Sequence, residues 1–397
     1  MRYNTCPWGG SMHLPPDIIF CDLTLREGEQ TPGASYTQEE RIELVTLLDR
    51  FGIHQIQISV PGLNPRALAS CREICAVKTK AKKEIMTGGM APNWKELIDA
   101  ANDCNPDIIH SGFEVSHFNA REWNESVREG MKARVREVAA YILSKGKICN
   151  ISFTDATRAD FGFLMAMVET AAAAGARRVR IADSFGVGTP EGMSMAVANA
   201  VKRAEPHGCI VGVHCHNDFG LALANTFACI RAGAKLIDLC ANGLGDRAGN
   251  ADLVEAAVAL EALYGAPTGL DTAMCMEIAR FTEKISGIVI PPNKPLVGSN
   301  VFSEEMEAHF VEQFERPVEG RSLVPEDIGA RLGVLYGSLT TERIVKMTGE
   351  YAKKPIPEQH VPAIVDKIHA QAQKQKGVPI NEETFWEIAD GVMGKQP

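Results

Sequence analysis

The sequence predicts an α/β fold: a (β/α)8 TIM barrel followed by a smaller, mainly helical C-terminal region. Eight short apolar segments alternate with helical patterns from about residue 17 to residue 265. A (β/α)8 barrel needs this number of strand–helix repeats over about 250 residues, whereas a doubly wound sheet normally uses fewer strands. A dinucleotide-binding fold is also disfavoured, because no G-x-G-x-x-G follows the first apolar segment.

The strand and helix patterns follow one another along the chain with recognisable start signals. The first expected helix begins at a capping box, Thr37-Gln38-Glu39-Glu40, and a later one has Pro190 at its first position, after Thr189. Alanine-rich runs such as Ala256–Leu263 have high helix propensity. In chain order, the expected strands are Ile18–Leu25, His54–Val60, Glu84–Gly88, Asp107–Phe113, Ile148–Phe153, Arg178–Ser184, Ile210–His216 and Lys235–Asn242.

The pattern changes after Ile290-Pro291-Pro292, where prolines punctuate a loop-rich region. Helical patterns resume at Thr340–Tyr351, Val361–Lys376 and Asn381–Met393. We therefore expect three parts: an N-terminal arm over residues 1–16, a catalytic barrel over 17–285, and a C-terminal lid and helical subdomain over 286–397.

Composition excludes several classes of function. The net charge of −9 disfavours a nucleic-acid partner, and no run of about 18 apolar residues predicts a membrane span. The N-terminus lacks an apolar signal core. Eleven scattered cysteines, mostly inside apolar segments, indicate reduced and buried thiols. We expect a cytoplasmic protein without a membrane partner.

The triplet His214-Cys215-His216 ends an apolar run, Ile210–Val213. Because residues two apart on a strand point to the same face, both imidazoles would project together from the strand's carboxyl end. Such a pair is suited to binding a metal ion. A pair of hydrogen-bonded histidines at a strand end is the alternative that the triplet alone leaves open.

Three polar clusters follow expected strands: residues 22–30, 214–218 and 242–250. Barrel enzymes place catalytic groups at the carboxyl ends of their strands, so these clusters should converge on one pocket. Two imidazoles, a carboxylate and a carbonyl-type oxygen suit Mg²⁺, Mn²⁺ or Zn²⁺, which can polarise a carbonyl group. The residues alone indicate metal-assisted carbon–carbon bond chemistry at a ketone, or metal-assisted hydrolysis.

The segments 25–33, 214–218 and 242–250 resemble the signatures of one family of barrel metalloenzymes. It contains isopropylmalate, homocitrate and citramalate synthases, with hydroxymethylglutaryl-CoA lyase as a relative, and the resemblance runs over about residues 17 to 310. It implies a Claisen condensation of a 2-oxo acid with acetyl-CoA as co-substrate. Hydrolysis of the thioester would then release a 2-hydroxy di- or tricarboxylic acid.

The resemblance also implies roles for individual residues. Arg26 would orient the thioester and stabilise the enolate oxygen. His309 would be a general acid or base with Glu305 beside it, offered to the barrel of a neighbouring subunit, so a homodimer is expected. The implied metal ligands are Glu27, His214, His216 and Asn250, and the implied substrate contacts are Gln30, Ser152, Thr154, Ser184 and His117.

Several positions depart from the synthase pattern. Thr154 and Gln57 stand where the synthases usually have glutamate, and an arginine typical after the third strand is missing from residues 89–93. His110 and Ser116-His117, expected at the end of the fourth strand, could supply replacement contacts. The identity of the 2-oxo acid therefore stays open.

Two other functions remain as alternatives. One is a metal-dependent lyase or aldolase, although lyase relatives place a cysteine in the loop after the eighth strand and Asp246–Gly249 contains none. The other is a binding protein on a decayed enzyme scaffold. About 100 residues follow the barrel, too few for the regulatory domain that many isopropylmalate synthases carry.

Overall fold

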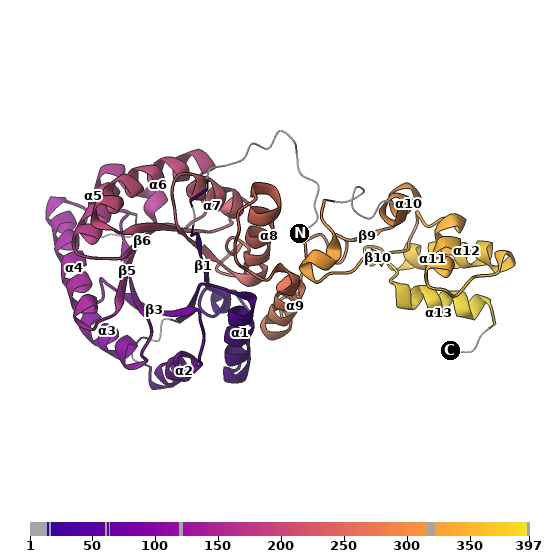
Figure 1. Cartoon of the computed structure of the whole chain (residues 1–397), viewed down its shortest axis with the longest axis horizontal. Coiled ribbons are helices and arrows are strands. Elements are labelled where there is room, and N and C mark those ends of the chain that lie inside the picture. Colours follow the sequence, from indigo (N-terminus) through magenta and orange to yellow (C-terminus); the bar gives the residue numbers. More distant parts are fainter. Residues whose placement is uncertain are drawn as a thin grey trace. The chain divides into compact units, whose positions relative to one another are not determined.

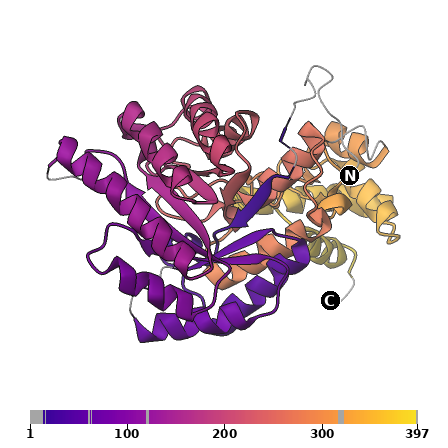
Figure 2. The ribbon, with the colours of Figure 1, turned by 60° about the vertical axis from the view of Figure 1, so that its left-hand side comes forward.

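The computed structural model describes residues 14, 15, 17–59, 62, 64–118, 122–315 and 322–394, and it confirms the predicted fold class. Eight parallel strands close into one barrel in sequence order, and helices surround them (Figures 1 and 2). The strands are β1 (Ile19–Asp22), β2 (Gln55–Ser59), β3 (Lys82–Gly88), β4 (Ile108–Glu114), β5 (Ile148–Thr154), β6 (Arg178–Asp183), β7 (Ile210–Cys215) and β8 (Leu236–Leu239).

Each predicted strand segment overlaps an observed strand, with differences at the ends. The prediction Ile18–Leu25 is too long, because the amides of Arg26, Glu27 and Gly28 all donate to the Leu23 carbonyl oxygen at 2.8–3.3 Å and turn the chain. The expected second strand ended at Val60, which lies outside the described residues.

The helices begin where the sequence supplies caps. Thr37 and Glu40 form the predicted capping box of α1 (Gln38–Phe51), and Thr189 caps α6 (Pro190–Ala204), which has proline at its first position. The other barrel helices are α2 (Pro65–Ala76), α3 (Trp94–Asp103), α4 (Glu125–Ser144), α5 (Phe161–Ala173), α7 (Ala222–Arg231), α8 (Leu253–Tyr264) and α9 (Cys275–Ser286). None of the helices in the described part of the chain is both long and apolar enough to cross a membrane.

The interior of the barrel is unusually polar. Glu84 of β3, Arg180 of β6 and Asp238 of β8 are fully or almost fully buried, and Arg180 binds both carboxylates. These strands are not neighbours in the sheet, so the contacts cross the inside of the barrel. Barrel interiors are mostly filled by branched apolar side chains, and here charged groups replace several of them.

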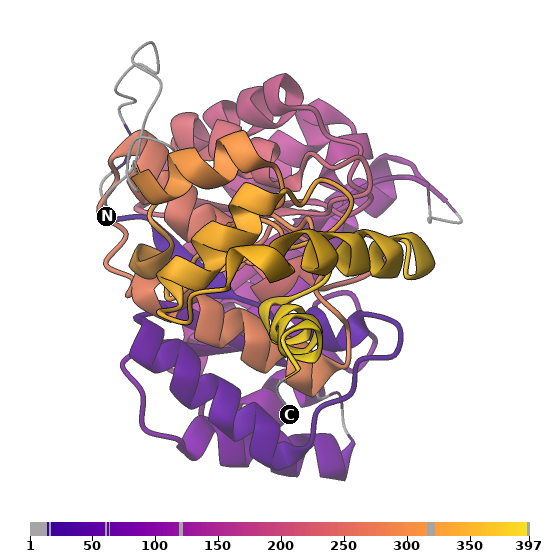
Figure 3. The same cartoon turned by 90° about the vertical axis from the view of Figure 1, so that its right-hand side faces the viewer.

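Residues 290–394 form a separate compact unit, so contacts divide the chain between Val289 and Ile290. A short parallel pair, β9 (Ser303–Glu304) and β10 (Gly333–Val334), labelled in Figure 1, accompanies its helices, which are coloured orange to yellow in Figure 3. Tyr336 stacks on Phe385 at a ring-centroid distance of 4.2 Å in its apolar core. The helices are α10 (Glu307–Glu315), α11 (Glu342–Tyr351), α12 (Val361–Lys374) and α13 (Glu382–Val392).

The three helices predicted after residue 340 are therefore confirmed, whereas α10 and the β9–β10 pair were not predicted. A strand of two residues leaves no periodic pattern to detect. Of the expected N-terminal arm over residues 1–16, only Leu14 and Pro15 belong to the described residues.

Candidate active site

Three side chains that could bind a metal ion meet at the carboxyl end of the barrel. One ligand atom each from Glu27, His214 and His216 lies within 4.8 Å of the others. Glu27 Oε1 is 3.3 Å from His216 Nε2 and 3.8 Å from His214 Nε2, and the two Nε2 atoms are 3.1 Å apart. All three residues are buried. The alternation along the strand thus brings the two imidazoles together, as predicted.

Glu27 is positioned by the turn that follows β1. It directly precedes a short 3-10 helix, η1 (Gly28–Gln30). The Gly245 amide donates to Thr31 Oγ1 at 2.8 Å, which joins this turn to the loop after β8. A Cβ atom at Gly245 would lie 3.2 Å from Glu27 Cγ and 2.0 Å from Asn250 Nδ2, so the close approach of the two loops requires glycine there.

The protonation state of His214 suits a metal ligand. Burial lowers the pKa of His214 to about 4, although a hydrogen bond from Nδ1 to Asp238 Oδ2 at 3.2 Å opposes the shift. Burial also lowers the pKa of His216, and the charge of Arg247 adds to this effect. Both rings are therefore neutral at pH 7. With the proton of His214 on Nδ1, its Nε2 lone pair faces Glu27.

Asn250 completes the cluster from the loop after β8. A β-bridge pairs Asn250 with His216, and the Asn250 amide nitrogen Nδ2 donates to the Leu244 carbonyl oxygen at 3.2 Å. Its Oδ1 atom is buried and has no hydrogen-bond partner. Buried carbonyl oxygens are normally paired, so this atom is available to a ligand.

The residues fit a divalent metal ion. A carboxylate, two neutral imidazoles and a free amide oxygen are a donor set that Mg²⁺, Mn²⁺ and Zn²⁺ accept. Asp238 supplies the carboxylate that commonly orients a metal-binding histidine. Glu27, His214, His216 and Asn250 are thus the groups that could hold such an ion.

A pocket of about 280 Å³ lies over this cluster. Several predicted substrate-binding and catalytic residues line it: Arg26, Gln30, Ser152, Thr154 and Ser184. Arg26 forms an ion pair with Glu27, and its Nε atom donates to Gln57 Oε1 at 2.5 Å. The guanidinium is thereby fixed beside the candidate metal ligands.

The remaining predicted residues lie elsewhere. His117 is exposed after β4, where its ring stacks on Phe118 at a centroid distance of 4.3 Å, and it is not among the residues of the pocket. His309 and Glu305 belong to the second unit. The His309 side chain is 56% exposed and its Nδ1 is 3.6 Å from Glu304 Oε2. Glu305 Oε1 accepts a hydrogen bond from the Leu339 amide at 2.7 Å.

The floor of the pocket holds charged residues that the sequence pattern did not identify as site residues. Arg180 Nη1 is 2.5 Å from Glu84 Oε1, and its Nε is 3.0 Å from Asp238 Oδ1. Burial opposes ionisation of Glu84, but the charge of Arg180 and the hydrogen bonds with His110 and Arg180 hold its pKa well below the usual range. The sequence does contain a pattern that could have identified Arg180. Arg178 and Arg180 alternate with apolar residues, so both side chains point to the inner face of β6.

His110 belongs to this floor as well. It lies in the middle of β4, whereas the sequence placed it at the strand's end. Its Nδ1 is 3.0 Å from Gln57 Nε2 and 3.1 Å from Glu84 Oε1. Burial lowers the pKa of His110, which keeps the ring neutral at pH 7.

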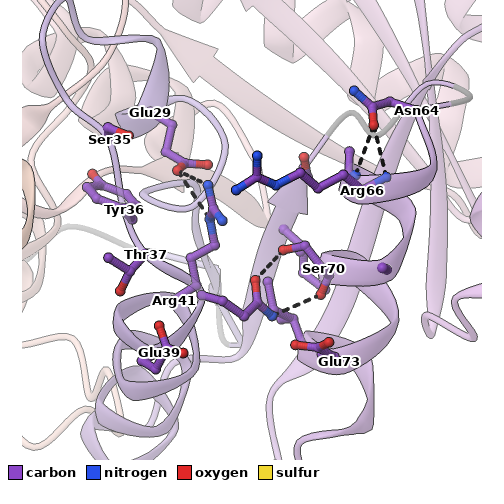
Figure 4. Close-up of a pocket in the computed structure, with 16 residues that line it drawn as sticks. Glu29, Ser35, Tyr36, Thr37, Glu39, Arg41, Asn64, Arg66, Ser70 and Glu73 are labelled. Carbon is purple, nitrogen blue, oxygen red and sulfur yellow. Dashed lines mark hydrogen bonds and ion pairs between the residues drawn. The ribbon is translucent and has the colours of Figure 1, made fainter.

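A larger pocket of about 750 Å³ lies between α1 and α2 (Figure 4). Arg41 crosses it to Glu29 at 2.5 Å, and Ser70 Oγ donates to Gln38 Oε1 at 2.5 Å. Within the described residues, the only group of three candidate metal ligands is in the smaller pocket. The smaller pocket is therefore the candidate active site.

Comparisons with known proteins identify relatives of this chain. A family model described as HMGL-like matches residues 17–282. A protein of Ignicoccus hospitalis named "probable 2-isopropylmalate synthase" is 36% identical over 96% of this chain and 94% of its own length. A homocitrate synthase of Methanopyrus kandleri is 34% identical over 96% of this chain and 94% of its own length.

Solved structures agree on the fold. The HMG-CoA lyase of Bacillus subtilis superposes with a TM-score of 0.60 at 15% identity, covering 70% of this chain and 97% of the lyase. The HMG-CoA lyase of Pseudomonas aeruginosa gives a TM-score of 0.59 at 19% identity, covering 70% of this chain and 96% of that chain. At this identity the likeness concerns the barrel alone.

Proposed function

This chain belongs to the HMGL-like family, and we propose that it is an enzyme that condenses acetyl-CoA with a 2-oxo acid. The product would be a 2-hydroxy di- or tricarboxylic acid. The observation that carries the proposal is the cluster of Glu27, His214 and His216 with the free amide oxygen of Asn250 beside it. The names of the full-length relatives support the same reaction.

Glu27, His214, His216 and Asn250 would hold a divalent metal ion, Mg²⁺, Mn²⁺ or Zn²⁺. When bound, such an ion supplies Lewis acidity toward the carbonyl oxygen of the 2-oxo acid. Asp238 and the turn after β1 keep the side chains in place before substrate arrives. A site organised in advance loses less free energy on binding.

Arg26 would bind the thioester oxygen of acetyl-CoA. It lines the pocket, and Gln57 and Glu27 fix its guanidinium there. A fixed positive charge stabilises an oxygen that gains negative charge when the methyl group of acetyl-CoA loses a proton. The methyl carbon then bonds to the keto carbon, the keto oxygen takes a proton, and water cleaves the thioester to release CoA. Gln30, Ser152, Thr154 and Ser184 would contact the substrate.

His309 would act as the acid or base of these proton transfers, with Glu305 beside it in sequence. The exposed imidazole of His309 is accessible to a barrel of another subunit. We therefore propose a homodimer in which the C-terminal unit of one subunit serves the barrel of its partner.

The test is thiol release from acetyl-CoA with a panel of 2-oxo acids and Mg²⁺, Mn²⁺ or Zn²⁺. We expect metal-dependent release with at least one acid, and no release by a folded His214→Ala protein, which should also bind no metal. Absence of release with every acid would refute the condensation. Metal-dependent formation of acetyl-CoA from a 3-hydroxyacyl-CoA would instead establish a lyase.

A further inference from the structure

We propose that the 2-oxo acid has a single carboxylate and a short, uncharged side chain, so that acids with a second carboxylate are rejected. This inference rests on the proposed function, and it concerns the part of the pocket that the metal ligands leave open. Three features carry it: the pairing of the arginines, the charge balance of the pocket and the composition of the wall opposite the metal ligands.

Every arginine that lines the pocket already has a carboxylate partner. Arg26 pairs with Glu27, Arg180 with Glu84 and Asp238, and Arg247 Nε with Asp218 Oδ1 at 2.7 Å. No lysine is among the described residues that line this pocket. A second substrate carboxylate would therefore have to break an existing ion pair or stay unpaired, and burying an unpaired charge is costly.

The charge balance disfavours a dianion as well. The pocket's three arginines contact four carboxylates, those of Glu27, Glu84, Asp218 and Asp238, and Asp246 is a further carboxylate of the pocket lining. A divalent metal ion could compensate the carboxylate next to the keto group. Within the described part of the pocket, no further cation remains for a second one.

Several uncharged side chains line the pocket opposite the metal ligands. Glu27 and the histidines come from β1 and β7, whereas Met86, Ser152 and Thr154 come from β3 and β5 across the closed barrel. Ala182 and Phe185 also line the pocket.

Gly112 of β4 lies between Met86 and Ser152 in this wall. A Cβ atom at Gly112 would be 3.1 Å from Met86 Cε and 3.4 Å from Ser152 Oγ. The lack of a side chain at Gly112 thus lets the Met86 thioether and the Ser152 hydroxyl pack close to the strand. Such a surface suits a short aliphatic chain, and it offers a carboxylate only hydroxyl donors.

A matched pair of substrates tests this proposal directly. 2-Oxopentanoate and 2-oxoglutarate have the same number of carbons and differ by a terminal methyl or carboxylate group. We expect kcat/KM for thiol release to be at least about 100-fold higher for 2-oxopentanoate, the scale expected when a buried charged group stays unpaired. Equal values, or a preference for 2-oxoglutarate, would overturn the proposal.

A calorimetric titration without acetyl-CoA separates this inference from the proposed function. The protein loaded with Mn²⁺ should bind 2-oxopentanoate more tightly than 2-oxoglutarate. If this order of affinities holds but thiol is never released, the selectivity stands and the condensation fails. If thiol is released with 2-oxoglutarate as the better substrate, the condensation stands and the selectivity fails.

A variant tests the role of the wall. Met86→Arg would place a guanidinium that has no carboxylate partner in this part of the pocket. The variant should therefore have a higher kcat/KM for 2-oxoglutarate relative to 2-oxopentanoate. Met86→Leu is the matched control and should keep the preference of the unaltered protein. An unchanged preference in a Met86→Arg protein with unaltered thermal unfolding would contradict the assignment of this wall.

Discussion

The carboxylate of Asp238, on β8, makes two contacts. Its Oδ2 atom accepts a hydrogen bond from His214 Nδ1 at 3.2 Å, and its Oδ1 atom binds Arg180 Nε at 3.0 Å. The first contact fixes which nitrogen of His214 faces Glu27. The second holds the carboxylate in place through Arg180, which Glu84 anchors in turn.

We predict that Asp238→Asn weakens metal binding about 10- to 100-fold, the usual cost of losing the partner of a metal-binding histidine. An asparagine has a single acceptor oxygen, so it cannot satisfy His214 and Arg180 together. Calorimetric titration with Mn²⁺ measures the change. Asp246→Asn, which removes a carboxylate from the same pocket without touching His214, should have a smaller effect. Equal affinities in Asp238→Asn and the unaltered protein would contradict this role.

The residues at strand ends were predictable, whereas those within the strands were not. Glu27, His214 and Asn250 stand in polar segments directly after apolar ones, and the barrel fold predicts that such ends converge. Arg180 and Asp238 stand inside strands, among apolar neighbours. Only the closed sheet shows that their side chains meet across the interior, because a strand pattern does not specify which strand lies opposite.

At the level of elements, a buried acid ties β1 to the segment after β8. Asp22 accepts hydrogen bonds from the Thr24 amide at 2.9 Å and from Thr24 Oγ1 at 2.8 Å. Thr24 Oγ1 in turn accepts from the Ala241 amide at 2.9 Å. Burial raises the pKa of Asp22 from 3.8 to about 7, although the hydrogen bonds with Thr24 oppose the shift.

This pKa predicts a loss of stability as the pH rises from mildly acidic to neutral values. Because the folded pKa of Asp22 exceeds the unfolded value, its protonated form stabilises the fold fully below about pH 4, and this stabilisation is lost as the pH rises through 7. The free energy of unfolding should therefore fall between about pH 4 and pH 8, by at most about 1.4 kcal/mol per pH unit from this group, and most steeply between the unfolded and the folded pKa.

Asp22→Asn should remove that part of the pH dependence, because its amide can donate to Thr24 Oγ1 and its oxygen can accept from the Thr24 amide. Urea unfolding at several pH values measures this pH dependence of the free energy of unfolding. The control, Asp103→Asn on the exposed end of α3, makes the same charge change and should leave the slope unaltered. A slope that persists in Asp22→Asn would show that other groups cause it.

The elements themselves were largely predictable because their local signals agree with the fold. Thr37 and Thr189 mark helix starts by capping chemistry that works within one turn. The end of β1 was not predictable, since it depends on a three-amide turn around the Leu23 carbonyl oxygen.

At the scale of the whole molecule, the chain has two compact units, and the proposed chemistry draws on both. The metal-binding cluster belongs to the barrel, whereas His309 lies on α10 of the unit that begins at Ile290. Sequence predicted the change of character near residue 290, because prolines and loops interrupt the strand–helix alternation. That His309 serves the barrel of a neighbouring subunit was implied only by the resemblance to the synthases, because the chain's own pattern says nothing of a partner.

A mixture of two inactive variants tests whether His309 of one subunit acts at the barrel of its partner. His214→Ala should lose metal and activity, and His309→Ala should keep metal and lose turnover. When the two are dissociated, mixed and reassociated, hybrid dimers contain one barrel with intact metal ligands facing a partner with an intact His309. Thiol release should then recover in part, with dimer formation followed by light scattering.

Mixing His214→Ala with His216→Ala is the matched control, because both defects lie in the barrel and no hybrid has an intact metal site. If hybrids form and the first mixture recovers no more activity than the control, His309 does not serve a neighbouring barrel.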